Sequence, residues 1–528
     1  MIDINILQKA IVLTQQGNFD EAEKIYRELE KQNSDDVTLL STFGLFYVSK
    51  RDFEKASYYL EKACSIEESF GVISALGYAK YEQKNYKDAA IVFERALSFG
   101  ENADVYDKLI SCLFQIKHYS KAISFTEIMY EKYPENQNSV VNKIKSLTQS
   151  GKLREAEVLC VENLKENNNN AALWLQLGYL KELIYSDDKQ ACECFKIVLE
   201  LGHKEALYSI ASSLYKQGDY KNAEIYYKKM LDIFPRSSDT KTGLGLLYLK
   251  QKRFKEGYEI LFQAEKLPIQ KFSKNHYNVG DDLESDVIVL CDQGFGDHIQ
   301  YVRYLPILKT KVKKLQVCVH HSLRKLFEYN YPEIDFIAPS EVNPEIQSVK
   351  ITDLPYILDM DFDNIPYKEG YLKSDLSNIV SEKQKIGLCW EAGNAGIRTM
   401  INRTINIKDL ESIINLDKVQ IFSLQVNDSF DGCERYPQII DLANEFNDFS
   451  DTAKAIMAMD LVITVDTSVA HLAGALGKKT FLLLPYVTDW RWFEDDNTTA
   501  WYDSVQIFKQ VNPISWKEPI ENILKILI

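Results

Sequence analysis

The residue types best suited to chemistry lie in one segment near the end of the chain, residues 466–477. An apolar run rich in β-branched residues, 461–465, precedes this segment, and a second apolar run, 480–484, follows it. This order predicts strand, turn, helix and strand. Asp466 and Thr467 are residue types that cap helix N-termini, so the helix would begin there. Its unpaired N–H groups, at the carboxyl end of a strand, would suit a phosphate group.

Three further features of this segment bear on ligand binding. Ser468 places a second hydroxyl group at the start of the predicted helix. His471 lies four residues after Thr467, one helical turn deeper on the same face, so hydroxyl and imidazole could reach one ligand. Small residues farther along would let the helix approach a sheet closely. The same spacing also fits a capped helix with a core histidine, and spacing alone leaves both interpretations open.

The segment resembles the donor-site signature of glycosyltransferase family 9, the heptosyltransferase-like group with the GT-B fold. The resemblance is greatest to the bacterial branch that carries an attached tetratricopeptide array. Four blocks match in order, at residues 460–477, 483–485 (Leu-Leu-Pro), 489–492 (Asp-Trp-Arg-Trp) and 501–502 (Trp-Tyr). The resemblance implies an inverting transfer from a nucleotide sugar. It also implies that Asp466, Thr467 and Ser468 lie at the helix N-terminus, with His471 beside the nucleotide or its phosphate.

A second candidate site follows the strand pattern at residues 286–291. Gly294 and Gly296 relax the turn, and Asp297 is placed to cap the helix expected over residues 299–308 or to project into a cleft. The resembled family has a Gln-Gly-x-Gly-Asp block here, whose Asp is the proposed general base, and Asp297 matches it. A carboxylate could take the acceptor proton as the hydroxyl attacks the anomeric carbon. His298 replaces the family's more common small hydroxyl residue, so it is the alternative base or an acceptor contact.

The remaining donor-site candidates also rest on the resemblance. Arg403 matches an arginine block that would neutralise the leaving phosphate through paired N–H donors, with a surface salt bridge as the alternative. Gln425 follows a predicted strand, at 419–424, and resembles a family glutamine near the base or ribose. Asn394, in the loop after the strand at 385–390, completes the expected donor-binding set. The donor half has no Asp-x-Asp pair to hold a divalent cation, and GT-B enzymes generally work without one, so neither metal nor other cofactor is expected.

The first half of the chain is a repeat array. A small residue recurs about every 34 residues, the period of the tetratricopeptide repeat, a helix–turn–helix unit. The recurring positions are Ala22, Ala56, Ala89, Ala122, Ala156, Ala191, Ala223 and Gly257. The pattern predicts eight repeats over residues 1–268. Such a superhelix has a concave face suited to an extended peptide or a partner protein, although a spacer or dimerisation element would show the same pattern.

Composition limits the classes of function. The composition, 45% hydrophobic and 26% charged, is that of ordinary globular proteins. A chain of 528 residues is too long for one hydrophobic core, so several domains are expected. A net charge of -15 disfavours a nucleic-acid-binding surface. The nine cysteines lack metal-ligand spacing, which favours free thiols. No apolar run approaches the roughly 18 residues of a membrane span, and the N-terminus lacks a signal-peptide pattern, so a cytoplasmic location is expected.

Together these features predict an all-α tetratricopeptide superhelix at residues 1–268 followed by an α/β GT-B glycosyltransferase. Its two Rossmann-like halves would be the acceptor side at 269–380 and the nucleotide-sugar side at 381–528. The resemblance implies transfer of a sugar to a Ser or Thr hydroxyl of a protein acceptor held by the repeats, with flagellin a possible partner. The alternatives are a lipid or saccharide acceptor, or a non-catalytic repeat scaffold with a decayed transferase domain.

Overall fold

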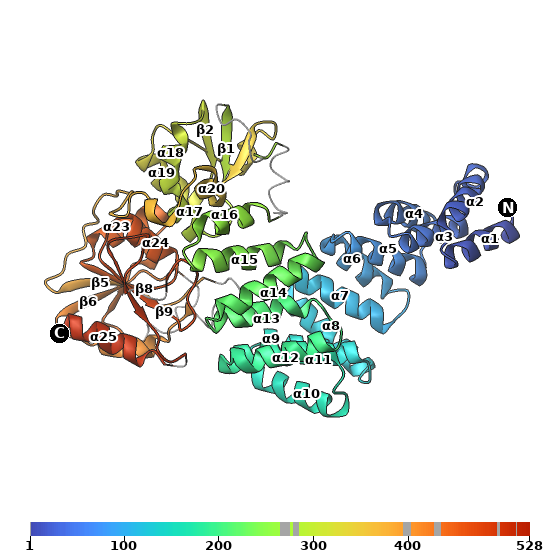
Figure 1. The fold of residues 1–528 in the computed structure, drawn as a ribbon, viewed down its shortest axis with the longest axis horizontal. Coiled ribbons are helices and arrows are strands. Elements are labelled where there is room, and N and C mark those ends of the chain that lie inside the picture. Colours follow the sequence, from blue (N-terminus) through green and yellow to red (C-terminus); the bar gives the residue numbers. More distant parts are fainter. Residues whose placement is uncertain are drawn as a thin grey trace. The chain divides into compact units, whose positions relative to one another are not determined.

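The computed structural model describes residues 2–264, 275–277, 285–393, 403–426, 435–493, 497–513 and 515–528. The chain divides into two compact units, Met1–Leu201 and Gly202–Ile528 (Figure 1). The division falls within the helical array, so the last four helices of the array belong to the same unit as the β-sheets. The predicted domain boundaries at residues 268 and 380 stay predictions.

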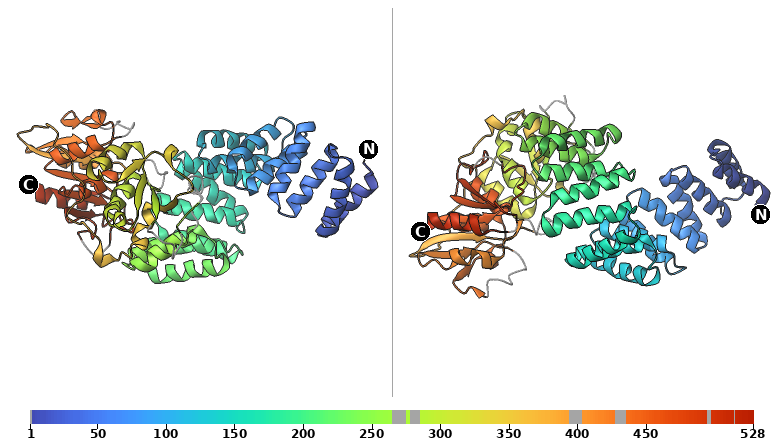
Figure 2. Two further views of the ribbon diagram at one scale, coloured as in Figure 1. Left: turned by 90° about the horizontal axis from the view of Figure 1, so that it is seen from above. Right: turned by 60° about the horizontal axis from the view of Figure 1, so that its bottom comes forward.

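Among the described residues, sixteen helices precede the first strand, which confirms the predicted all-α array of eight helix pairs. Successive pairs stack side by side within each unit (Figure 2). The first unit holds α1 Ile4–Gln15, α2 Phe19–Gln32, α3 Val37–Ser49, α4 Phe53–Ile66, α5 Phe70–Glu82, α6 Tyr86–Ala96, α7 Ala103–Gln115, α8 Tyr119–Lys132, α9 Gln137–Gln149, α10 Leu153–Glu166, α11 Ala171–Tyr185 and α12 Asp188–Glu200. The second unit continues the array with α13 Ala206–Lys216, α14 Tyr220–Ile233, α15 Ser238–Lys250 and α16 Phe254–Phe262.

In four of the repeats the two helices pack closely because a glycine on the first helix faces a large side chain on the second; these glycines are Gly44, Gly77, Gly178 and Gly245. A Cβ atom placed on Gly77 in α5 would lie 2.7 Å from the ring of Phe93 in α6. A Cβ on Gly178 in α11 would lie 2.4 Å from the ring of Phe195 in α12. Each ring occupies the space that a larger residue would need. The glycines on the first helices therefore set the distance between the paired helices in these repeats.

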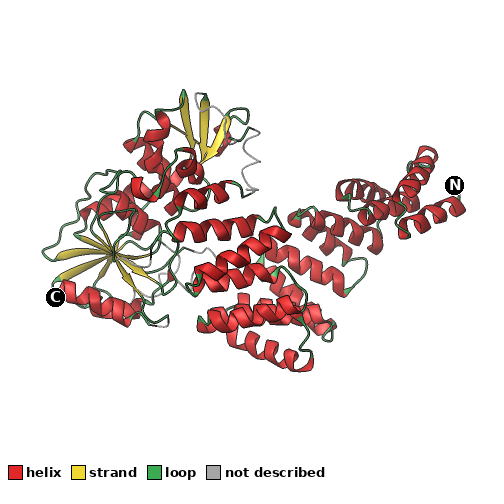
Figure 3. Cartoon of the chain, in the orientation of Figure 1, coloured by secondary structure: helices red, strands yellow, loops and turns green. Residues whose placement is uncertain are grey.

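The second unit also contains two fully parallel β-sheets (Figure 3). The four-stranded sheet has the order β3-β2-β1-β4, and the six-stranded sheet has the order β10-β9-β8-β5-β6-β7. The strands of the first sheet are β1 Asp286–Leu290, β2 Lys314–Cys318, β3 Asp335–Ile337 and β4 Gln347–Lys350, with helices α17 Phe295–Tyr301, α18 Leu305–Lys309, α19 His321–Asn330 and α20 Leu354–Ile357. The second sheet has β5 Gln384–Cys389, β6 Val419–Ser423, β7 Ile439–Asp441, β8 Leu461–Val465, β9 Thr480–Leu484 and β10 Val505–Lys509, with α22 Glu411–Ile414, α23 Phe449–Ala458, α24 Ser468–Ala475 and α25 Lys517–Leu527.

Apolar residues cover both faces of the six-stranded sheet. On β5, Ile386 and Leu388 join a buried cluster with Ile523 of α25. On β8, Val462 joins the opposite cluster, which includes Leu472 of α24. The alternation along each strand sends neighbouring side chains to opposite layers of helices, as in a doubly wound sheet. The α/β class predicted for this part of the chain is therefore confirmed.

In both sheets the strand order reverses next to the first strand. Chain order runs outward from β5 to β7 on one side and from β8 to β10 on the other, and the first sheet reverses between β1 and β4. Open parallel sheets bind ligands at the carboxyl ends of the strands that flank such a reversal. The sheet topology thus directs attention to the loops after β1, β5 and β8.

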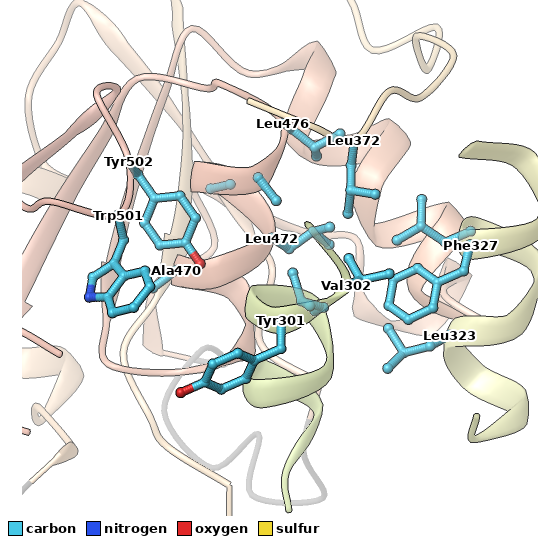
Figure 4. Close-up of a cluster of buried hydrophobic side chains, with 14 of the residues drawn as sticks. Tyr301, Val302, Leu323, Phe327, Leu372, Ala470, Leu472, Leu476, Trp501 and Tyr502 are labelled. Atoms are coloured by element: carbon cyan, nitrogen blue, oxygen red, sulfur yellow. The ribbon is translucent and has the colours of Figure 1, made fainter. Parts of the chain in front are cut away.

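An apolar cluster joins the two halves that contain these sheets. Helix α17 of the first half packs against α24 of the second, and α19 packs against α23, and side chains of the segment after β9 join the same cluster (Figure 4). The labelled side chains are Tyr301, Val302, Leu323, Phe327, Leu372, Ala470, Leu472, Leu476, Trp501 and Tyr502. The loops at the two strand-order reversals are therefore held close to each other.

Two general expectations concern thiols and membranes. The cysteines within the described residues are free thiols, most of them buried. No described helix combines the length and the apolar character needed to cross a membrane.

The glycine packing predicts the effect of two substitutions in one helix. Gly77→Ala should destabilise the protein by about 1–3 kcal/mol, because the new methyl group meets the Phe93 ring. Gly71→Ala, also in α5, is the matched control, since a Cβ there meets no atom within 4 Å and alanine gains up to about 1 kcal/mol of helix propensity. Denaturant unfolding measures both changes. Equal stability of the two variants would show that close helix approach is not limiting.

Candidate functional site

The predicted strand–turn–helix–strand segment is present as expected. Thr467 caps α24, and its Oγ1 accepts a hydrogen bond from the backbone N–H of Val469 at 3.2 Å. Ser468 is the first helical residue, and Asp466, directly after β8, is buried. The N-terminus of α24 therefore lies at the strand-order reversal between β5 and β8, where parallel sheets bind ligands.

The loop after β1 differs from its prediction in one important respect. Helix α17 begins at Phe295, not at residue 299, so the predicted start was wrong. Asp297 lies in the first turn, where its Oδ2 accepts the N–H of Gly294 at 3.1 Å. Because this carboxylate closes the turn from within, the helix can start immediately after Gly294. Asp297 thus both stabilises the helix start, as predicted, and keeps Oδ1 available for a second contact.

Helices α17 and α24 pack against each other across the two halves. A Cβ atom on Gly296 would lie 2.8 Å from Cδ2 of His471, so only glycine permits this approach. The second glycine of the Gly-x-Gly pattern is therefore required by packing between the helices. The two candidate segments that the sequence singled out separately meet at this contact.

A chain of alternating charges extends through the site. Arg491 forms an ion pair with Asp297 Oδ1 through Nη2. Its Nη1 lies 2.8 Å from Asp489 Oδ1. Arg403 continues the chain, with Nη2 3.4 Å from Asp489 Oδ2 and Nη1 3.3 Å from Asp466 Oδ2. Five charged side chains therefore connect the loop after β1 with the start of α24.

Burial and charge compete within this chain. Burial by itself would raise the pKa of Asp489, but Arg491 and Arg403 outweigh it and lower that pKa to about 2. Burial raises the pKa of Asp466, and Arg403 only partly opposes the shift. The carboxylate of Asp466, in turn, raises the pKa of Arg403. Both arginines thus remain cationic near neutral pH, and Asp466 is the carboxylate whose charge is least favoured.

His471 is a packed residue in this structure. Its Nδ1 lies 2.9 Å from the hydroxyl of Tyr502, and its ring stacks on Trp492 at 5.4 Å between centroids. Burial is the main cause that lowers the pKa of His471 to about 3, so the imidazole is neutral. In this structure Thr467 caps its own helix and His471 packs against Gly296. Their predicted contact with one shared ligand therefore stays a prediction.

The alternative base, His298, is also buried. Its Nε2 lies 3.1 Å from the carbonyl oxygen of Asp292, and since a carbonyl only accepts, Nε2 carries the proton. Burial lowers the pKa of His298. Nδ1 is buried and has no hydrogen-bond partner among the described residues. The hydrogen bond from His298 to Asp292 ties α17 to the loop after β1. Whether His298 or Asp297 is the base stays a question for mutagenesis.

Gln425 supports the loop after β5. Its Oε1 accepts the N–H groups of Trp390 and Glu391 at 3.1 and 2.9 Å, and its Nε2 donates to the carbonyl oxygen of Glu391 at 3.2 Å. The predicted contact with a nucleotide is untested, and the observed bonds give this side chain a positioning role. Asn394, the remaining donor-site candidate, lies outside the described residues.

Asp489 and Arg491 were not among the predicted site residues, although both stand in the matching Asp-Trp-Arg-Trp block. Asp489 and Arg491 pair with each other, but their other partners, Arg403 and Asp297, are distant in the chain. The available signal was two opposite charges placed among tryptophans, which predicts buried charges that need partners. Among the described residues, no group of three or more His, Cys, Asp or Glu side chains is arranged to hold a metal ion.

Comparison with known proteins places the array in a recognised class of repeat. The protein-family model Tetratricopeptide repeat matches residues 204–237, which contain α13 and α14. Together with the eight helix pairs, this match identifies the array as tetratricopeptide repeats. The chain is similar to Protein FlbA of Caulobacter vibrioides, with 24% identity over an alignment of 273 residues that covers 43% of this chain and 44% of FlbA. It thus spans less than half the length of that relative.

Several solved structures resemble part of the chain. YrrB is 19% identical, with a TM-score of 0.29 over 35% of this chain and 96% of that structure. A tetratricopeptide repeat protein from Parabacteroides merdae is 18% identical, with a TM-score of 0.37 over 44% of this chain and 94% of that one. Yeast Tom70 is 18% identical, with a TM-score of 0.39 over 48% of this chain and 56% of Tom70.

The buried neutral His471 predicts a loss of stability in mild acid. Its pKa is about 3 when folded against an ordinary value of 6.5, so below pH 6.5 the unfolded chain binds the proton and the folded chain does not. The neutral imidazole therefore contributes to the free energy of unfolding above pH 6.5, and this contribution is lost as the pH falls toward 3, by about 2 kcal/mol at pH 5. Thermal unfolding of His471→Asn should show a shallower fall between pH 7 and 5. An unchanged slope would contradict the assignment.

Proposed function

We propose that the second unit is a GT-B glycosyltransferase that moves a sugar from a nucleotide sugar to a hydroxyl group without a bound metal, by inversion. One observation supports the proposal. The carboxylate of Asp297 after β1 is joined to Asp466, at the start of α24, through Arg491, Asp489 and Arg403, and both parallel sheets reverse their strand order at this place. A two-substrate transfer needs such a meeting point, because donor and acceptor must approach from separate binding surfaces.

The residues support a direct displacement. Asp297 would accept the proton of the acceptor hydroxyl. In the same step, the hydroxyl oxygen of the acceptor forms a bond with the anomeric carbon of the sugar. The bond between that carbon and the donor phosphate breaks in the same step, and its electron pair leaves with the phosphate. The charge that develops there is favoured by the N-terminus of α24 and by the cationic Arg403. This assignment places the proton acceptor and the leaving group at opposite ends of the charge chain.

The proposed acceptor is a protein. Tetratricopeptide superhelices offer extended concave surfaces that hold peptides or partner proteins, and the array forms about half of this chain. The half that would bind the acceptor contains only four strands among the described residues, so much of the recognition would fall to the repeats. We propose a Ser or Thr side chain of a bacterial protein as the acceptor, with flagellin as the first candidate and the cytoplasm as the location.

The base assignment predicts the behaviour of Asp297→Asn. An amide cannot take the acceptor proton, so transfer should fall by roughly 100-fold or more while nucleotide-sugar binding is retained. A transfer assay and calorimetry measure the two properties. Asp335→Asn, at an exposed carboxylate of the same half, is the matched control and should leave transfer unchanged. Near-normal transfer by Asp297→Asn, with loss in His298→Ala, would move the base role to His298.

If the repeats recognise the acceptor and the α/β halves bind the nucleotide sugar, removing most of the repeats should separate the two properties. The test is a truncated chain of residues 202–528, one of the two compact units. The shortened protein should unfold cooperatively and bind the nucleotide sugar, but modify the protein acceptor at least about ten-fold less efficiently, since most of the recognition surface is gone. Full-efficiency modification would favour a lipid or saccharide acceptor. Absence of nucleotide-sugar binding in both the full chain and the truncated chain would favour the scaffold alternative.

A further inference from the structure

The last residue of α15, Lys250, is buried against the second α/β half although its side chain is cationic. Its Nζ donates hydrogen bonds to Thr488 Oγ1 and, at 2.8 Å, to the carbonyl oxygen of Trp492. A third contact, at 3.3 Å, reaches the carbonyl oxygen of Asp489. All three acceptors belong to one short segment, residues 488–492. An ammonium group has three N–H donors, so it can bind several oxygens of one segment at once.

Aromatic contacts place the same helix pair firmly. The ring of Phe254 in α16 stacks on Trp501 at 5.7 Å and meets the edge of Trp490 at 6.2 Å. The hydroxyl of Tyr258 lies 3.4 Å from that of Tyr301 in α17. The eighth repeat therefore contacts both α/β halves and the segment between Thr488 and Trp492.

That segment carries the centre of the charge chain. Lys250 binds the backbone of Asp489 itself, and Arg491 lies between Asp489 and Trp492 and extends from there to Asp297. Thr488 Oγ1 also donates to the carbonyl oxygen of Trp492 at 2.8 Å, which closes the segment into a turn. A guanidinium reaches a distant carboxylate reproducibly only if its own backbone is fixed.

We propose that Lys250 is a positioning residue for the candidate site: it fixes the turn at residues 488–492 so that Arg491 holds Asp297. The eighth repeat is then a structural part of the site rather than one more surface for partners. The geometric part of this inference is independent of the reaction, and only its consequence for turnover rests on the proposed function.

The position explains why a lysine is required. An apolar side chain of similar length would fill the same space but leave two carbonyl oxygens and one hydroxyl oxygen buried without this donor. The cation also lies at the C-terminal end of α15, where the helix dipole favours positive charge. The bonds made by Lys250 are therefore specific to an ammonium group.

The test compares Lys250→Met with Lys229→Met in the full chain by hydrogen–deuterium exchange. Lys229 is an exposed lysine of the neighbouring helix α14, so its substitution is chemically identical but makes no contact with the turn. Lys250→Met should speed amide exchange about ten-fold or more in residues 487–493, and also in residues 294–298, where Asp297 loses its fixed partner. The control should match the wild type in both segments.

A second pair of measurements protects the test against simple unfolding. Thr488→Val removes one acceptor and should speed exchange in the same two segments by a few-fold. The effects of the two substitutions on exchange should be less than additive in the double variant, because both act on one contact.

Under the proposed activity, Lys250→Met should lower kcat about ten-fold with little change in the KM for the protein acceptor. Unchanged exchange in Lys250→Met and Thr488→Val would overturn the inference. Faster exchange at 487–493 alone would overturn the link to Asp297.

Discussion

The ion pair between Arg491 and Asp297 is the interaction on which the candidate site depends. It joins two halves that share an apolar cluster, and apolar contacts resist separation but specify orientation weakly. An arginine fork and a carboxylate match only within a narrow range of distances and angles. The close contact of Gly296 with His471 serves the same end, because it brings α17 near enough to α24 for Arg491 to span the gap.

Buried cations recur at the junction of these halves, and each joins segments distant in the chain. Arg303 is fully buried and donates to the carbonyl oxygens of Pro366 and Trp501 at 3.2 and 3.1 Å, and to the hydroxyl of Tyr371 at 3.2 Å. Lys250 likewise binds neutral oxygens. Burying a charge costs several kcal/mol before its partners are counted, so such residues contribute less to net stability than to a defined arrangement.

Sequence reasoning succeeded where local pattern and tertiary packing agree. Strands at 461–465 and 480–484 were predicted with their observed bounds because every residue in them is buried, and a continuous apolar run reports that directly. It failed where a distant partner decides the outcome. The strand at residues 347–350 contains Gln, Ser and Lys, and gains its place by pairing with β1. The role of Arg491 needs a carboxylate 194 residues away, which no spacing rule can supply.

The last repeat shows how the two parts of the chain came to form one site. A tetratricopeptide pair normally buries its outer face against the next repeat, and a terminal pair must cover that face in another way. Here Trp490 and Trp501 of the second α/β half pack against Phe254 and cover this face of α16. Lys250 of α15 supplies a cation to the turn beside them. The solution to a packing problem at the end of the array thus also determines the backbone that carries Arg491. Changes at this end of the array should therefore reach the candidate site.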